Sequence, residues 1–513
     1  MNKIIVKEIS FKLPISFLIA LLSLSACSFG DSGKIETRIL PTANSYQLNT
    51  TMGMARVASL TGSTESGTIT GYKIVQAPVN GTLGAIAFNQ YWGSATVVYT
   101  PNAGFVGTDS FTFASVNSEG SVSEPATVSY QVYPLATSTL LQGRSDGKGV
   151  DLVIIGDAFT ATDQPRFRDA VQKYIDHFST YDPLFAKQVS AWNIHRLDLI
   201  SPTSNLDELT PLEAHFYCIP NIRRALCVDS TTARIAVSAV VPQYDEIVVL
   251  VNTDTGGGTG GASVAVSNVS SSSDPLVIAS WLDTILHEMG HSFAGLGDEY
   301  IDNTLGGLQA SFSYEPPYPN LTINNDTATV KWNLWLDDPN VDVFEGGLYY
   351  SLGVWRPTFT SMMREFSQPF YAVNLEAWTL ALYDSLMPFA TSKTFFSFLP
   401  VGTLPQRYLG DSPDGDIFID RVETNVSHAL GGQFTYSVEQ SIGATVQQVD
   451  WYVNDILTLS NSTSFTCCTA QSSNYKVTAK VYDISGAVRN DESNSSNLDN
   501  ITRDNIVWNV TLQ

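Results

Sequence analysis

The chain has 513 residues and a formal net charge of −23, with 27 Lys and Arg against 50 Asp and Glu. This acidic balance argues against a nucleic-acid-binding protein, because the chain lacks the basic stripe that phosphates need. The length exceeds what one hydrophobic core usually organises, so we expect several domains.

Residues 1–26 predict an export signal that takes no part in the fold. A basic start is followed by the apolar run 13–24, which is too short to span a bilayer. Leu24-Ser25-Ala26-Cys27 resembles the lipobox of bacterial lipoproteins, in which the cysteine is lipidated and becomes the N-terminus. The resemblance implies anchoring through Cys27 at the outer membrane or cell surface, or an extracellular location. Ordinary cleavage after Ala26 is the alternative.

Residues 36–133 predict an all-β domain. Short runs of Val, Tyr, Phe and Thr are separated by Gly, Asn and Pro, and helical periodicity is almost absent. The segment 99–113, which reads YTPNAGFVGTDSFTF, resembles the cadherin-like, Ig-like repeats of bacterial surface proteins. Such modules are spacers or adhesive units, and we interpret this one as a spacer.

Residues 146–392 predict a mixed α/β domain. An apolar strand over 150–155 precedes a helix whose apolar residues recur at helical spacing between 167 and 178. Further strands are expected over 192–200 and 247–251. Cys218 and Cys227 lie in one loop and can pair in an exported protein. The glycine cluster 256–261 is expected to be flexible.

Residues 398–513 return to β character. The segments 449–455 and 475–483 alternate apolar and polar residues, as strands with one buried face do. A Trp on the first and a Tyr-x-Val-x-Ala pattern on the second resemble a polycystin-type Ig-like sandwich. The expected architecture is therefore an α/β (α+β) catalytic domain between two all-β Ig-like sandwich domains.

The strongest chemical signal is His287-Glu288-Met289-Gly290-His291. Histidines at i and i+4 lie on one face of a helix, so both imidazoles can bind one zinc ion. Glu288 follows the first ligand and can take a proton from zinc-activated water. Asp274-Pro275 predicts the start of this helix, as N-cap and first helical residue. The alternative is a buried helix with two hydrogen-bonded histidines.

A catalytic zinc site needs a third protein ligand and an open position. Asp298 is our first choice, and the chain must bend to bring it back, which Gly295 and Gly297 permit. Glu299, or a glutamate farther downstream, is the alternative.

The segment 287–300, HEMGHSFAGLGDEY, resembles the active-site sequence of the bacterial IgA-peptidase family of zinc metallopeptidases. The segments 150–157, 244–252 and 356–364 also resemble that family, so the likeness covers most of residues 150–380. It implies the zincin fold, a zinc cofactor and a protein substrate. Within 356–364, Ser361-Met362-Met363 resembles the Met-turn beneath the metal of metzincins, with Met363 as the floor residue. The alternative is two core methionines. The glycine at 295 falls one residue later than the metzincin pattern requires, which leaves the third ligand open.

Three weaker predictions concern the surroundings of the site. Residues 262–267 precede the active helix, as the edge strand at the cleft rim does in zincins, and such a strand can bind an extended peptide. The alternative is a plain edge strand. Tyr371 can donate to an oxyanion, although packing or exposure is the simpler role. The other histidines lack ligand spacing, and we interpret them as structural: His177, His195, His215 and His428.

The sequence thus predicts a secreted, lipid-anchored, monomeric zinc endopeptidase with His287, His291 and Asp298 as metal ligands and Glu288 as general base. One rival is a surface adhesin whose zinc domain is vestigial, and the intact Glu288 argues against it. The second rival is a zinc hydrolase that acts on a non-peptide amide.

Overall fold

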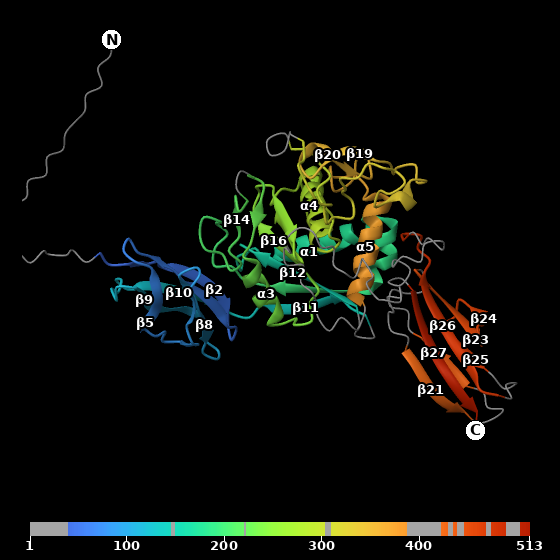
Figure 1. Ribbon diagram of the computed structural model, residues 1–513, viewed down its shortest axis with the longest axis horizontal. Helices are drawn as coiled ribbons and strands as arrows, with labels where there is room; N and C mark the ends of the chain where they lie inside the picture. The colour runs from blue at the N-terminus through green and yellow to red at the C-terminus, as the bar shows by residue number, and fades with distance from the viewer. Residues whose placement is uncertain are drawn as a thin grey trace, which may run out of the picture.

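The computed structural model describes residues 39–144, 149–219, 222–302, 309–386, 422–428, 434–438, 446–467, 473–488 and 503–512. Figure 1 shows a β region near the N-terminal end, a mixed α/β region in the middle and a second β region at the C-terminal end. The predicted export signal and Cys27 lie outside the described residues. Within the described part of the chain, no helix is both long and apolar enough to cross a bilayer.

The N-terminal region is a sandwich of two sheets, with strand orders β2-β10-β9-β5 and β3-β8-β6, and β7 paired to β8. Alternate residues of facing strands bury aromatic rings between the sheets, among them Tyr99, Phe111, Phe113 and Tyr130. The β character predicted for this region is therefore confirmed. Its strands are β1 (Thr42–Ala43), β2 (Tyr46–Thr51), β3 (Arg56–Leu60), β4 (Gly62–Ser63), β5 (Ile69–Gln76), β6 (Gly81–Leu83), β7 (Ala87–Asn89), β8 (Ser94–Pro101), β9 (Gly107–Asn117) and β10 (Ala126–Tyr133).

The central region contains a six-stranded sheet in the order β11-β13-β12-β16-β18-β17. The four inner strands are parallel, and the two edge strands are antiparallel to their neighbours. The first strand begins before the expected start of this domain at residue 146. Inner strands such as β12 are buried at every position because both faces of the sheet are covered. The strands are β11 (Thr137–Gln142), β12 (Val150–Asp157), β13 (Trp192–Asp198), β16 (Glu246–Asn252), β17 (Gly258–Gly261) and β18 (Val264–Val269).

Helices cover both faces of this sheet. Apolar residues of α1, α4 and α5 share one core with one face, and α3 packs on the other. The predicted start of the active helix is confirmed: the Asp274 carboxylate accepts a hydrogen bond from the Leu276 amide at 2.9 Å, with Pro275 as the first helical residue. The helices are α1 (Gln164–Tyr181), α2 (Pro183–Gln188), η1 (Val189–Ala191), α3 (Ser230–Ser238), α4 (Pro275–Ser292), η2 (Asn333–Trp335) and α5 (Tyr371–Leu386). Two hairpins complete the region, β14 (His215–Phe216) with β15 (Leu226–Cys227), and β19 (Phe344–Gly347) with β20 (Tyr350–Arg356).

The prediction of an edge strand over 262–267 is wrong. Strand β18 is fully buried between β16 and β17, and the edge strand is β17, which the glycine cluster forms. The segment Gly258–Gly261 thus forms a strand rather than a flexible loop. Because its glycines lack side chains, this strand can lie directly on α4. A Cβ on Gly260 would collide with the backbone carbonyl of Glu288. The peptide-binding role of the edge stays a prediction, and it now concerns β17.

The C-terminal region is again β-sandwich-like, with strand orders β21-β27-β26-β23-β24 and β22-β25 around a core that includes Trp451. Its strands are β21 (Val422–His428), β22 (Phe434–Ser437), β23 (Gln447–Val453), β24 (Ile456–Ser460), β25 (Ser464–Cys467), β26 (Tyr475–Asp483) and β27 (Arg503–Leu512). The chain is therefore multidomain, with a mixed α/β region between β-sandwich-like regions.

Both β regions contact the central one. The buried Asn49 side chain donates to the Thr210 carbonyl at 2.7 Å, and Arg56 pairs with Asp229, the N-cap residue of α3, at 3.2 Å. On the other side, the Tyr383 hydroxyl of α5 donates to Asp483 at 2.6 Å. If the N-terminal module is a spacer, it is one that packs against the central region.

Candidate metal centre

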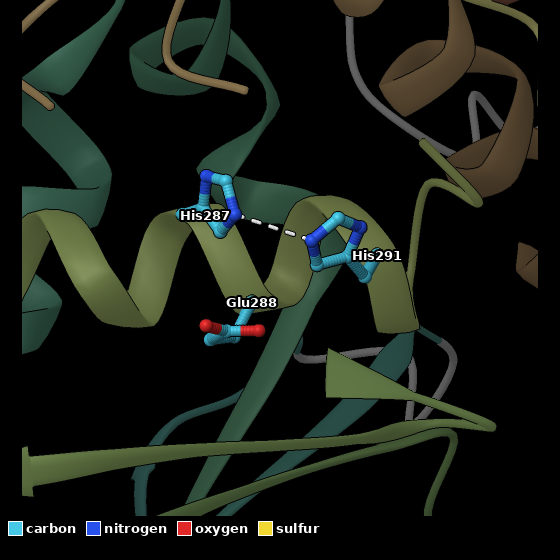
Figure 2. A group of neighbouring side chains, drawn as sticks. All are labelled: His287, Glu288 and His291. Carbon is cyan, nitrogen blue, oxygen red and sulfur yellow. Dashed lines mark hydrogen bonds between the residues drawn. The ribbon is translucent and has the colours of Figure 1, made fainter. Parts of the chain in front are cut away.

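Helix α4 places His287 and His291 on one face, with their Nε2 atoms 3.2 Å apart (Figure 2). The Nδ1 atom of His287 lies 3.0 Å from the Met362 carbonyl, and that of His291 lies 2.7 Å from the Leu296 carbonyl. A carbonyl oxygen can only accept, so each Nδ1 donates and each neutral ring turns an Nε2 lone pair toward the other. Two facing lone pairs need a positive charge between them.

Asp298 completes a triangle with the two histidines. Its Oδ1 atom lies 3.1 Å from Nε2 of His287 and 3.2 Å from Nε2 of His291. Ligands about 2.0–2.1 Å from one tetrahedral zinc ion are separated by roughly 3.3 Å, so the three atoms fit a common ion. The predicted bend is present: α4 ends at Ser292, and Gly295 has a φ of 65°, in the left-handed region that favours glycine.

The electrostatics of the triangle also favour a cation. Burial lowers the pKa of His291, but the adjacent Asp298 carboxylate outweighs burial and raises that pKa to about 9. In the absence of a metal, the centre therefore attracts a proton to His291. A divalent cation bound by the same three atoms would replace this proton and balance the negative charge of Asp298.

Glu288 projects from the side of α4 that faces neighbouring strands (Figure 2). One of its carboxylate oxygens nevertheless lies within 4.8 Å of donor atoms of both His287 and His291. The side chain is buried, and burial raises its pKa above the ordinary value. Strand β17 encloses it: a Cβ on Gly258 would lie 2.9 Å from Glu288 Oε1. A carboxylate held this way can exchange a proton with water at the metal centre.

Glu299 turns away from the triangle and is fully buried. Its Oε1 atom accepts from the side-chain amides of Asn320 and Asn374, each at 3.0 Å. Its Oε2 atom accepts from the hydroxyls of Ser361 at 2.8 Å and Thr358 at 3.2 Å. Burial raises its pKa, while these donors lower it. Glu299 therefore ties the segment after α4 to the predicted Met-turn.

The predicted Met-turn lies against the helix that carries the histidines. Met362 and Met363 are both fully buried, and the Met362 carbonyl orients His287. The Met363 sulfur lies so close to Gly290 that a Cβ there would be 2.6 Å away. Just after the turn, the Phe366 ring packs edge-on to His287, with 5.8 Å between centroids.

Tyr349 was missed at the sequence level. Its hydroxyl donates to Oδ2 of Asp298 at 2.5 Å, the carboxylate oxygen that does not face the histidines. The residue sits at the tip of the β19–β20 hairpin, where Leu348 and Tyr349 have φ values of 48° and 72°. The amide of Leu348 also donates to the Asp298 carbonyl, at 2.8 Å. A two-residue turn with both φ positive usually carries Asn-Gly, so Leu-Tyr gave no signal.

The remaining predictions have simple outcomes. Cys218 and Cys227 form a disulfide, as their spacing allows. Two of the other histidines pair with carboxylates elsewhere, His177 with Asp283 at 3.0 Å and His195 with Asp151 at 2.7 Å. Tyr371 begins α5 with a φ of 60°, and its oxyanion role stays a prediction.

Comparison with protein families identifies the central region. Residues 139–340 match the family model described as IgA Peptidase M64. The match includes the His287-Glu288-x-x-His291 cluster, which is consistent with a metal site. The resemblance predicted from the sequence is thus confirmed: this segment is an IgA peptidase M64 family domain, and that membership implies a zinc metallopeptidase. No curated protein matches the chain.

Solved structures align with limited parts of the chain. The sialic acid-binding region of a Streptococcus sanguinis SK1 adhesin is 15% identical, with 22% of this chain and 34% of that one covered and a TM-score of 0.17. Fibronectin(III)-like modules of Clostridium thermocellum CbhA are 15% identical, with 18% and 89% covered and a TM-score of 0.13. A chimeric titin Z1Z2 is 13% identical, with 22% and 57% covered and a TM-score of 0.16. At these TM-scores, the similarities carry no functional argument.

Proposed function

We propose that this protein is a zinc-dependent endopeptidase that cleaves extracellular proteins. Its zinc ligands would be His287, His291 and Asp298, and its general base Glu288. The observation that carries the proposal is the triangle of two Nε2 atoms and one carboxylate oxygen at 3.1–3.2 Å, with a buried Glu288 carboxylate within 4.8 Å of the histidine donor atoms. The fold that this proposal assumes is that of a zincin.

The chain's own groups account for the proton transfers of peptide hydrolysis. Zinc held by the triangle would supply the Lewis acidity that makes water nucleophilic near neutral pH and polarises a carbonyl. Glu288 accepts the proton of the attacking water and delivers it to the leaving amine. Its burial favours the first of these transfers, because a raised pKa makes the carboxylate a stronger base toward the attacking water.

Casein or gelatin cleavage tests the proposal. We expect wild-type residues 28–513 to degrade at least one of these substrates, and a chelator or Glu288→Ala to abolish the activity. Added zinc should restore the chelated wild type but not the variant. If neither the wild type nor Glu288→Ala cleaves any of several protein substrates, the proposal is wrong. That result would favour the adhesin hypothesis.

Zinc content tests the ligand assignment separately. Asp298→Ala should lose most bound zinc, because a three-ligand site becomes a two-ligand one. Glu299→Gln keeps the neighbouring side chain nearly isosteric and should retain about one zinc per folded chain. Full occupancy in Asp298→Ala would assign the third ligand to another residue.

We also propose that the protein is exported and anchored through a lipid on Cys27. The support is the sequence pattern of residues 1–27, which lie outside the described structure. Cells expressing the wild type should incorporate labelled palmitate into the protein and hold it in the membrane fraction, whereas Cys27→Ser should be unlabelled. Label in the variant would contradict the assignment.

A further inference from the structure

The loop closed by the Cys218–Cys227 disulfide is attached to the strand that covers Glu288. Ala225 forms a parallel bridge with Gly258 of β17, and the Gly258 amide donates to the Arg224 carbonyl at 3.1 Å. The Thr259 hydroxyl adds a bond to the Leu226 carbonyl at 2.8 Å. Because β17 lies directly on α4, these bonds hold the backbone of Arg224 at a defined place beside the metal centre.

The Arg224 side chain is oriented by Tyr300, two residues after Asp298. Its Nη2 atom donates to the Tyr300 hydroxyl at 2.7 Å, and the guanidinium carbon lies 5.0 Å from the centre of the Tyr300 ring. That ring is in turn 6.5 Å from the ring of His287.

The guanidinium remains open to a ligand. The Arg224 side chain is 55% exposed, and its Nη1 atom lies 4.0 Å from Oδ2 of Asp302, which is beyond hydrogen-bond distance. A guanidinium carries five N–H donors in a planar fork that matches a carboxylate. A guanidinium that stabilised an oxyanion at the metal would be enclosed. The exposure of Arg224 therefore favours an interaction with a side chain of the substrate.

We propose that Arg224 is a specificity-determining residue that binds a carboxylate side chain of the substrate, so that the enzyme prefers Asp or Glu near the scissile bond. This inference rests on the proposed peptidase function and names its substrate class.

Pairs of fluorogenic peptides test the inference. The two peptides of a pair are identical except for Glu or Gln at one position, and that position is each of the three on either side of the cleaved bond in turn. At one position, wild type should cleave the Glu peptide with kcat/KM about tenfold higher than the Gln peptide. The preference should shrink at high ionic strength, because the pair is partly exposed. In Arg224→Gln the ratio should fall to near one, and Arg224→Lys should retain part of it.

The neighbouring Arg223→Gln is the matched control, since it removes the same charge from the same exposed turn. It should keep the wild-type ratio. Cleavage with no preference for Glu at any position, or a preference that survives in Arg224→Gln, would overturn the inference and leave the peptidase proposal standing. Failure of the wild type to cleave any peptide or protein substrate would overturn both.

Discussion

The hydroxyl of Tyr349 offers the sharpest test of how this site is built. It donates at 2.5 Å to the oxygen of Asp298 that faces away from the histidines. Tyr349→Phe removes this donor and keeps the ring, which packs 5.3 Å from that of Tyr300. Without the hydroxyl, the Asp298 carboxylate can rotate, and its buried outer oxygen loses a partner.

The expected cost follows from the role of such supporting bonds. Loss of a group that orients a metal ligand typically weakens metal affinity by roughly 10–100-fold, or about 1.4–2.8 kcal/mol. Zinc affinity, measured by competition with a chromogenic chelator, should therefore fall by that factor in Tyr349→Phe, and kcat should fall as well. The measurement does not depend on activity, so it separates weaker binding from slower chemistry.

Tyr350→Phe is the control, because it changes the next residue of the same hairpin, whose ring packs on Phe312 rather than on the metal centre. It should leave zinc affinity unchanged. If Tyr349→Phe binds zinc within about threefold of the wild type, the hydrogen bond does not position Asp298, and the reasoning from its short distance fails.

Gly260→Ala should lower the melting temperature and the activity together, because its Cβ would push β17 away from the Glu288 carbonyl. Calorimetry and casein assays check this prediction. An unchanged melting temperature would contradict the close packing. Burial raises the pKa of Glu246 from 4.5 to about 8. Between pH 4.5 and 8, the folded state therefore keeps a proton on Glu246 that the unfolded chain has lost. The free energy of unfolding should fall as the pH rises through this range. Urea titrations of Glu246→Gln should show a flatter pH profile than the wild type, and parallel profiles would refute the assignment. Zinc at 100 times its Kd should stabilise the wild type by about 2.7 kcal/mol and Asp298→Ala far less, as thermal shifts with and without a chelator can show.

The amino-acid sequence alone predicts the histidine pair with its glutamate, and the succession of a β region, an α/β region and a second β region. His287, Glu288 and His291 lie within five residues of one helix, so their relation follows from helical geometry alone. The same holds for the helix start at Asp274, which depends on local capping. Alternation of apolar residues likewise indicates the flanking β regions, because successive side chains of a strand point to opposite faces and only one face is buried.

The surroundings of α4 depend on contacts between segments that lie far apart in the sequence. The choice between the adjacent acids depends on partners far along the chain: Asp298 faces the histidines, while Asn320, Asn374 and Ser361 hold Glu299 away from them. The sequence predicts a flexible loop where β17 lies, since glycine favours both loops and close packing, and only the position of α4 distinguishes the two.

Tyr349 and Arg224 approach the centre through a hairpin turn and a disulfide-closed loop. Contacts of this kind join residues tens of positions apart, and their geometry is set by the packing of the whole domain. No local period or spacing in the sequence records them. The two histidines and the glutamate of α4 are therefore predictable from the sequence. Tyr349, which contacts Asp298, and Arg224, which we propose to select the substrate, become apparent only in the fold.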